Sequence, residues 1–322
     1  MHTPSATVLV TGANGFVGQV LCPELHRSGY RVRAAVRNEQ RGHGLPGELV
    51  AVGDLNPQTD WSAAVAHVDM VIHLAARVHV MDESASDPLA AFRAINVGAT
   101  VGLAHAAAQA SVKRLVYVSS IKVNGEATGS RPFTAQDLPA PQDPYGVSKW
   151  EAEQALRGIA RETGLEVTIV RPPLVYGPGV GGNFARLLKL VERRIPLPLG
   201  AVNNHRSMVY VENLTSALIS CAVHPAAAGQ TFLVSDGDDL STPGLIRNLG
   251  LMINSPARLW PVPTRVLLLA GLITRKRGEV ERLIGSLRVD SSELQTSLGW
   301  TPPFPVVEGL KRTAQWFVMR RG

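Results

Sequence analysis

Three glycines, each three residues after the last, follow a short, mostly apolar run near the start of the chain. The run is Thr7–Val10, and Gly12, Gly15 and Gly18 precede an apolar-periodic stretch that reaches Leu25. The pattern predicts a strand, a tight turn and a helix, because glycine adopts positive φ and allows close backbone approach. The start of such a helix offers unpaired N–H groups and a positive dipole end to phosphates. We therefore expect a dinucleotide site, formed by Gly12, Asn14, Gly15, Phe16, Val17 and Gly18.

The end of the second expected strand indicates which dinucleotide binds. An acidic side chain about 20 residues past the glycines would hold a free ribose 2′-hydroxyl. After the strand-like run Arg31–Val36 the chain has Arg37 instead, with Arg33 nearby. Because a guanidinium suits a 2′-phosphate, we expect NADP(H). Glu39 leaves NAD open as the alternative, with Arg37 then an ordinary solvated residue.

Length and charge describe an ordinary globular chain of 322 residues with a formal net charge of +6. The charge is spread without Lys/Arg blocks, which suits an anionic ligand and speaks against a nucleic-acid partner. Cys22 and Cys221 lie in apolar helical contexts and are expected to be reduced core thiols. No signal-peptide pattern opens the chain. We therefore expect a cytoplasmic protein, and we expect no metal site.

The longest uninterrupted apolar run, Val266–Ile273, is too short to span a bilayer. Trp260 and Pro261 precede it and Arg275-Lys276-Arg277 follow it, a combination that could touch a membrane surface. We expect a lid or packing helix instead, and no stable membrane insertion.

Strand-like and helix-like segments alternate through the first half of the chain. The strand candidates are short apolar runs without alternation, which suggests strands buried on both faces. The longest helical patterns are Pro88–Gln109, which follows the N-cap Asp87, and Tyr145–Arg161. We expect an α/β fold with a doubly wound parallel sheet of the Rossmann type. The candidate strands are Thr7–Val10, Val32–Val36, Leu49–Val52, Met70–Leu74, Leu115–Val118 and Val167–Val170, with Thr231–Val234 returning to the sheet edge.

From about Leu174 the composition changes, because Pro and Gly become dense and short helices follow. We expect residues 1–173 and 208–235 to form the cofactor-binding domain. Residues 174–207 and 236–322 are expected to form a smaller substrate-binding region.

One group of polar residues points to redox chemistry. Ser120 ends the fifth expected strand, and Tyr145 and Lys149 lie four residues apart, hence on one face of a helix. A neighbouring ammonium and a cationic nicotinamide would lower the pKa of Tyr145, which could then act as general acid or base. Ser120 could hydrogen-bond the substrate oxygen and stabilise charge that develops there. The three side chains predict hydride transfer at a hydroxyl or ketone carbon.

The order and placement of these motifs resemble the extended short-chain dehydrogenase/reductases, the NAD-dependent epimerase/dehydratase group, over essentially the whole chain. The motifs that carry the resemblance are Thr11–Gly18, Gly53–Leu55, His73–Ala76, Asn96–Thr100, Ser119-Ser120, Tyr145–Lys149 and Arg171-Pro172.

The resemblance implies catalytic roles for Ser120, Tyr145 and Lys149, and contact of Lys149 with the nicotinamide ribose. It implies that Asp54 and Leu55 approach the adenine. Asn124 replaces the tyrosine of the family's Val-Tyr-Gly motif, which puts any sugar contact of that tyrosine in doubt. Further cofactor contacts are implied for Leu74, Ala75, Ala76, Asn96, Ser119 and Pro172.

The second half resembles the nucleotide-sugar branch of this family. That likeness implies that Arg206 contacts the diphosphate of a UDP-sugar and that Asn183 contacts the uridine or a phosphate. Arg282 is implied as a second diphosphate arginine. The run Ser119–Glu126 resembles bacterial O-antigen enzymes that reduce UDP-2-acetamido-2,6-dideoxy-4-hexulose to UDP-N-acetylquinovosamine. Within it, Lys122 is expected to contact the sugar or the diphosphate, or to point to solvent.

The expected function is therefore NADPH-dependent reduction of the C4 ketone of a UDP-linked 4-keto-6-deoxy-N-acetylhexosamine, with the product stereochemistry open. The alternative is a UDP-N-acetylhexosamine or UDP-hexose 4-epimerase with tightly bound NAD. A 4,6-dehydratase is disfavoured, because Ser119-Ser120-Ile121 stands where that branch usually has Thr-Asp-Glu. A dihydroflavonol reductase shares the Val32–Arg37 pattern but not the features after Leu174. A non-catalytic NADP sensor is disfavoured by Tyr145 and Lys149. Family members commonly dimerise through the two long helices, so we expect a homodimer.

Overall fold

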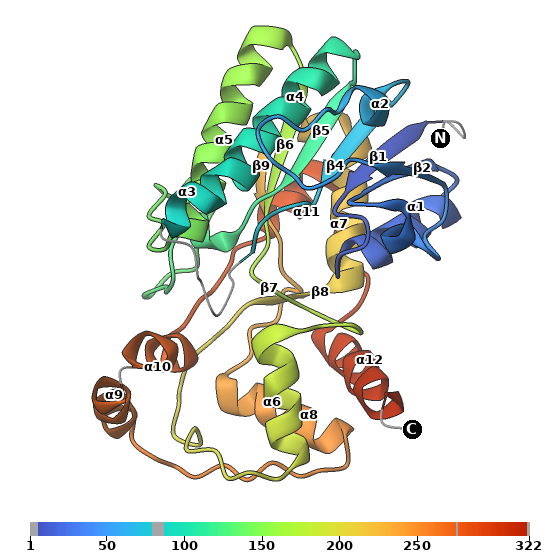
Figure 1. Cartoon of the computed structure of the whole chain (residues 1–322). Helices are drawn as coiled ribbons and strands as arrows, with labels where there is room; N and C mark the ends of the chain where they lie inside the picture. Colours follow the sequence, from blue (N-terminus) through green and yellow to red (C-terminus); the bar gives the residue numbers. More distant parts are fainter. Residues whose placement is uncertain (1–5, 79–86, 275, 321–322) are drawn as a thin grey trace.

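The computed structural model describes residues 6–78, 87–274 and 276–320. Its centre is a seven-stranded parallel sheet in the order β3-β2-β1-β4-β5-β6-β9 (Figure 1). The last expected strand is β9, which pairs with β6 at the sheet edge as predicted. The bounds are β1 (Thr7–Thr11), β2 (Arg31–Val36), β3 (Glu48–Ala51), β4 (Met70–His73), β5 (Arg114–Val118), β6 (Glu166–Arg171) and β9 (Thr231–Leu233).

Helices cover both faces of this sheet (Figure 1). One face is buried by α1, α7 and α11, with Leu21 and Leu218 in its core, and the other by α2, α4 and α5, with Leu103 and Leu156. Strands covered on both faces read as continuous apolar runs, so the predicted doubly wound α/β fold is confirmed. The helices are α1 (Gly18–Arg27), α2 (Ser62–Val65), α4 (Thr100–Gln109), α5 (Pro144–Thr163), α7 (Val211–Val223) and α11 (Ser292–Leu298).

The winding of the sheet reverses between β1 and β4. These strands pair with each other, Thr11 opposite His73, while β2 lies on the far side of β1. Open α/β sheets bind ligands beyond the carboxyl ends of their strands at such a switch point. The glycine turn follows β1 and Leu74–Ala76 follow β4, so both motifs lie there.

A single helix is expected from the sequence over Pro88–Gln109, but the middle of this segment is not α-helical. The side chain of Asp87 caps α3 (Pro88–Arg93), Ala94–Ala99 form a π-helical turn, and α4 then begins. The wider turn accompanies the hydrogen bonds of Asn96 to the backbone of Arg77. Such turns are frequent at functional sites, and this one faces the segment that follows β4.

A smaller region lies below the carboxyl ends of the strands (Figure 1). β7 (Leu174–Tyr176) and β8 (Met208–Tyr210) form their own two-stranded parallel sheet. A third core beneath it includes Phe184, Ile246 and Leu310, and the partly buried Phe16 and Val17 of the glycine turn pack against this core. The division into two domains stays a prediction. The helices here are α6 (Gly182–Glu192), α8 (Thr242–Met252), α9 (Thr264–Ile273), α10 (Arg277–Ile284) and α12 (Val306–Met319).

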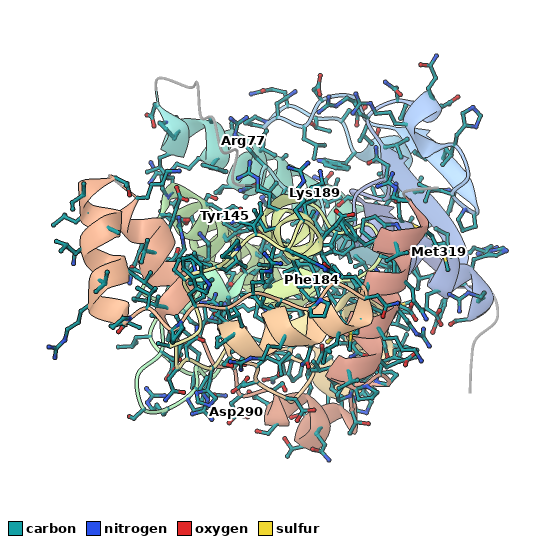
Figure 2. All side chains as sticks on the ribbon, turned by 90° about the horizontal axis from the view of Figure 1, so that it is seen from below. Arg77, Tyr145, Phe184, Lys189, Asp290 and Met319 are labelled. Atoms are coloured by element: carbon teal, nitrogen blue, oxygen red, sulfur yellow. The ribbon has the colours of Figure 1, made fainter. Side chains whose placement is uncertain are left out.

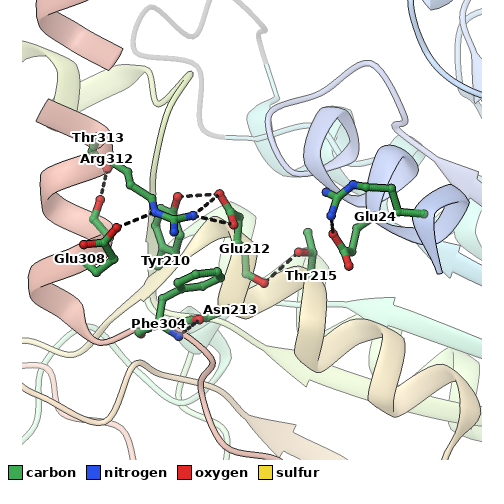
Figure 3. Close-up of polar contacts among 11 residues, drawn as sticks. Glu24, Tyr210, Glu212, Asn213, Thr215, Phe304, Glu308, Arg312 and Thr313 are labelled. Carbon is green, nitrogen blue, oxygen red and sulfur yellow. Dashed lines mark hydrogen bonds and ion pairs between the residues drawn. The ribbon is translucent and has the colours of Figure 1, made fainter. Parts of the chain in front are cut away.

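Polar contacts join the last helix to α7 at this junction (Figure 3). The side chain of Asn213 donates to the carbonyl of Phe304 (2.7 Å) and accepts from its amide (2.9 Å). Arg312 on α12 reaches Glu212 (3.2 Å) and lies 4.3 Å over the ring of Phe304. The end of the chain is therefore held against the helix that covers the main sheet.

Among the described residues, no helix is both long and apolar enough to cross a membrane. Cys22 and Cys221 are buried, free thiols. Burial raises the pKa of each to about 12, so both stay protonated at neutral pH.

Candidate active site

The glycine turn leaves no room for a β-carbon at Gly12 or Gly18. Gly12 has φ +66°, and a β-carbon there would lie 2.9 Å from the amide nitrogen of Ala75. A β-carbon on Gly18 would lie 2.5 Å from the carbonyl oxygen of Gly12. No side chain caps α1, and the Gln19 amide bonds back to the Gly15 carbonyl (2.9 Å), so the turn and the helix start form one compact backbone unit. This backbone cradle at the switch point fits the pyrophosphate of a dinucleotide.

At the expected adenine-ribose edge, Arg37 and Asp54 form an ion pair. The Arg37 Nε lies 2.7 Å from an Asp54 oxygen, and both side chains are exposed. The backbone places them together, since Gly53 N donates to the Arg37 carbonyl. Arg33 does not take part in this ion pair, because its side chain bonds Glu48 and the carbonyls of Ala64 and Ala66. An acidic side chain therefore lies beside the end of β2, although it comes from the segment after β3.

The ends of β1 and β4 are fixed by a buried histidine to which the sequence assigned no role. His73 accepts or donates at both ring nitrogens, to Thr11 (2.6 Å) and Thr100 (2.8 Å). Burial, with the charge of Lys149, lowers its pKa to about 3, so the ring is neutral. The Thr11 hydroxyl also accepts from the Ala75 amide, which holds the Leu74–Ala76 segment beside the glycine turn.

Asn96, expected as a cofactor ligand, is buried and committed to the protein. Its side chain pairs with both backbone groups of Arg77, at 2.8 and 3.0 Å, and donates to Ser148 at 3.0 Å. Asn96 therefore joins the segment after β4 to the catalytic helix α5. Its role in the structure is to hold this loop in place.

Tyr145 lies in the first turn of α5, half-buried, with Phe92 edge-on at 6.0 Å. Asp143 begins this helix by accepting from the Gly146 amide (2.7 Å). The Ser120 hydroxyl hydrogen-bonds the tyrosine, so both predicted catalytic residues meet. Figure 2, seen from the smaller region, shows Tyr145 in the upper central part of the view.

The pKa of Tyr145 is expected from the sequence to be lowered, and this is wrong as far as the protein's own groups are concerned. Burial raises its pKa to about 12, the Ser120 hydrogen bond lowers it, and the Asp143 carboxylate raises it further. Lys149 does not offset this, since its ammonium points to another partner.

Lys149 is a fully buried cation under the catalytic pair. Its Nζ donates to the Val118 carbonyl (2.8 Å) and lies 4.6 Å from the Tyr117 ring centroid and 6.0 Å from that of Tyr145. Burial lowers its pKa to about 7, and Glu153 opposes the shift. The amine is therefore poised to change charge near neutrality.

A buried ionic network behind these residues was missed from the sequence. Glu153 pairs with Arg171 through two bonds, at 2.9 and 2.5 Å, and accepts from the Ser119 hydroxyl at 2.5 Å. Arg171 also donates to Asn124 (3.0 Å), which explains the asparagine at this position. Ser119, expected as a cofactor ligand, is thus held by Glu153. The sequence places Glu153 one helical turn after Lys149, but nothing local marks Arg171 as its partner.

Lys122 is held beside the catalytic centre by two carboxylates. It pairs with Asp143 and with Glu126 (3.0 Å), and its side chain is mostly buried. The carbonyl of Pro172 accepts from Ile121 in the same turn (3.0 Å). The expectation that Lys122 points to solvent is therefore wrong. A contact of Lys122 with the sugar or the diphosphate would have to compete with these two ion pairs.

The two predicted diphosphate arginines lie together. Arg206 donates to the carbonyls of Arg282 (2.7 Å) and Gly285 (3.1 Å). Burial lowers its pKa, Glu126 raises it and the Arg282 charge lowers it. Asn183 lies apart from this pair, exposed in the first turn of α6.

Such a centre, with its tyrosine, serine and lysine beyond the ends of a dinucleotide-type sheet, is that of the short-chain dehydrogenase/reductase class. Residues 8–235 match the family model of the NAD-dependent epimerases and dehydratases. The chain belongs to this family.

Known relatives extend over the whole chain. It is 45% identical over 316 residues to a UDP-glucose 4-epimerase of Vibrio cholerae, covering 97% of this chain and 95% of that one. It is 29% identical to the N-acetyl-α-D-glucosaminyl-diphospho-ditrans,octacis-undecaprenol 4-epimerase of Escherichia coli O157:H7, over 96% of this chain and 94% of that one. The solved structure of MoeE5 with UDP-glucuronic acid and NAD superposes with a TM-score of 0.78 at 27% identity, covering 98% and 99% of the two chains.

Proposed function

We propose that this enzyme interconverts UDP-sugars that are epimeric at C4, using NAD that it retains between turnovers. The observation that carries the proposal is the Ser120–Tyr145–Lys149 centre in a chain 45% identical to a UDP-glucose 4-epimerase. The main expectation from sequence, a 4-keto reductase, has weaker support than this alternative. The ion pair between Arg37 and Asp54 also favours NAD, because a carboxylate 2.7 Å from the guanidinium would repel a 2′-phosphate.

The residues divide the work of moving one proton and one hydride. Bound NAD would supply a reversible hydride acceptor and a positive charge. Gly12, Gly15 and Gly18 would hold its pyrophosphate. Tyr145 takes the proton of the sugar O4 hydroxyl and later returns it, while the Ser120 hydroxyl positions that oxygen. Lys149, whose ammonium donates to the Val118 carbonyl and lies 6.0 Å from the Tyr145 ring centroid, would hold the nicotinamide ribose.

We propose that Arg206 and Arg282 anchor the substrate through its diphosphate. Anchoring far from the reacting carbon orients the sugar with remote binding energy. It also leaves the ring free to turn, which an epimerase needs and a reductase does not. The ion pairs of Lys122 with Asp143 and Glu126 would shape the nearby wall of the sugar site.

The second candidate is the NADPH-dependent 4-keto reductase. Arg37 at the end of β2 favours it, because the guanidinium could leave Asp54 for a 2′-phosphate. The resemblance of Ser119–Glu126 to the O-antigen reductases favours it as well. We also propose a homodimer through α4 and α5.

Two parallel incubations separate the two functions, one with a UDP-sugar and no added cofactor and one with a UDP-4-keto-6-deoxy-N-acetylhexosamine and NADPH. Purified protein is given UDP-glucose or UDP-GlcNAc without added cofactor, and the products are resolved by NMR. The proposal expects the C4 epimers to form, and Tyr145→Phe to abolish turnover while cofactor stays bound. Turnover only of a UDP-4-keto-6-deoxy-N-acetylhexosamine, with consumption of NADPH, would establish the reductase instead.

A further inference from the structure

The α9–α10 hairpin carries an apolar face that the described part of the chain leaves exposed. On α9, Ile273 is 75% exposed, Leu269 58% and Val266 52%. These residues are three and four positions apart, so they lie along one side of the helix. A patch of this kind on an ordinary soluble surface marks an interaction site.

The other side of α9 packs against the protein, so the helix is held in place although Val266, Leu269 and Ile273 are exposed. Leu267 and Gly271, one turn apart, are its buried residues. A β-carbon on Gly271 would lie 2.9 Å from Val280 of α10, so the two helices pack closely there. The hairpin is therefore a firm platform that presents Val266, Leu269 and Ile273 outward.

Basic residues surround this face. Arg265 lies on α9, and Lys276 and Arg277 lie between the helices and at the start of α10, all exposed. Within the hairpin Glu279 and Glu281 are the acidic residues, and Glu281 pairs with Arg277 at 2.7 Å. Arg275 belongs to the same basic run in the sequence but lies outside the described residues.

A tryptophan precedes the hairpin in the chain by four residues. Trp260 is 61% exposed, whereas its backbone is fixed, because its amide donates to Leu197 and its carbonyl accepts from Gly200. Exposed tryptophans in segments that flank apolar, basic helices are typical of proteins that lie on membrane interfaces.

We propose that the α9–α10 hairpin docks this enzyme on an anionic membrane surface, with Val266, Leu269 and Ile273 inserted among the acyl chains and the surrounding cations on the lipid headgroups. Charge complementarity selects this occupant. A second copy of the chain would bring Arg265, Lys276 and Arg277 against the same cations, and like charges oppose such a contact. Ten helical residues with one apolar side give reversible attachment, not insertion across the bilayer.

Docking would bring the candidate substrate site close to the membrane. Arg282 is part of α10, and its carbonyl accepts from Arg206 (2.7 Å), so the proposed diphosphate anchor is continuous with the docking hairpin. The hairpin projects from one side of the smaller region (Figure 1).

The test is flotation of the intact protein with two kinds of vesicle, phosphatidylcholine alone and phosphatidylcholine mixed with phosphatidylglycerol. The protein is expected to float with the mixed vesicles and much less with the neutral ones, and added salt should release it. The double variant Leu269→Glu/Ile273→Glu should lower the partition coefficient at least about tenfold, and Lys276→Glu should weaken it less. The matched control is Leu251→Glu on α8, which is 69% exposed but outside the hairpin.

All four proteins should share one circular-dichroism spectrum and melting temperature, because the changed side chains are exposed. Failure of the wild type to float with the mixed vesicles would overturn the proposal, as would equal flotation of the double variant. Sedimentation provides the other decisive outcome. If the wild type does not bind vesicles but sediments as a dimer, and the double variant sediments as a monomer, the apolar face is a contact between copies of the chain.

Discussion

At the scale of single residues, Lys149 is a functional group held at a cost in stability. Burial lowers its pKa from 10.5 to about 7, and at about 1.4 kcal/mol per pH unit this amounts to about 5 kcal/mol against the charged form. Between these two values the unfolded chain binds more protons than the folded one. The contribution of Lys149 to the free energy of unfolding therefore becomes more favourable as pH rises from 7 to 10.5.

We predict that Lys149→Met stabilises the protein at pH 7 while abolishing turnover. The gain should be about 1–2 kcal/mol, because the lost hydrogen bond to the Val118 carbonyl and altered packing offset most of the charge penalty. Urea denaturation at several pH values measures it. The difference from the wild type should shrink toward pH 10, and a variant that is less stable at pH 7 would show that this lysine is not strained by burial.

The network behind the catalytic residues gives a second prediction at this scale. Glu153→Gln removes the charge that faces the buried Arg171, and an uncompensated buried cation costs about 3–5 kcal/mol. The Ser119 and Arg171 positions should loosen, so the fall in kcat should exceed the change in NAD affinity. The control is Glu151→Gln on the same helix, whose partner Arg93 is exposed. Equal destabilisation by both changes would remove the buried pair from this role.

At the scale of elements, the π-helical turn between α3 and α4 is the feature that most directly positions the cofactor segment. Asn96→Ala deletes three buried hydrogen bonds to Arg77 and Ser148. We expect the free energy of unfolding to fall by about 2–3 kcal/mol and the dissociation constant for NAD to rise several-fold. Asn183→Ala, an exposed asparagine on α6, is the matched control for both measurements. An unchanged NAD affinity in Asn96→Ala would limit its role to stability.

The elements also show where prediction from sequence stops. The strand, turn and helix around Gly12 were predictable, because φ and close approach are local properties that select glycine. The α5 helix was predictable from its cap and spacing. The π turn and the Glu153–Arg171 pair were not, since each depends on a partner distant in the chain. The Arg37–Asp54 pair bears on cofactor choice. It could not be predicted for the same reason, because it depends on the register in which β2 pairs with β3.

At the scale of the whole molecule, the proposed mechanism requires the two regions to hold a fixed distance, because one carries Tyr145 and the other carries Arg206 and Arg282. The buried Asn213 of α7 helps to set it. Its side chain bonds both backbone groups of Phe304 and donates to Asp236 (2.8 Å), which also accepts from the Tyr210 amide and the Tyr176 hydroxyl. The helix over the main sheet and the final segment of the chain therefore share one buried polar cluster.

We predict that Asn213→Ala weakens this junction more than either half. The free energy of unfolding should fall by about 2–4 kcal/mol, because three hydrogen bonds are lost and the buried Asp236 loses a donor. Amide exchange should accelerate in α12 and β8 while β1, β4 and β5 stay protected. The proposed anchor and the catalytic tyrosine would then be less well aligned, so kcat should fall more than NAD affinity. Arg27→Ala, at the exposed Arg27–Glu24 pair, should change none of these. Uniform acceleration over the whole main sheet would instead mean that the two regions unfold as a single cooperative unit.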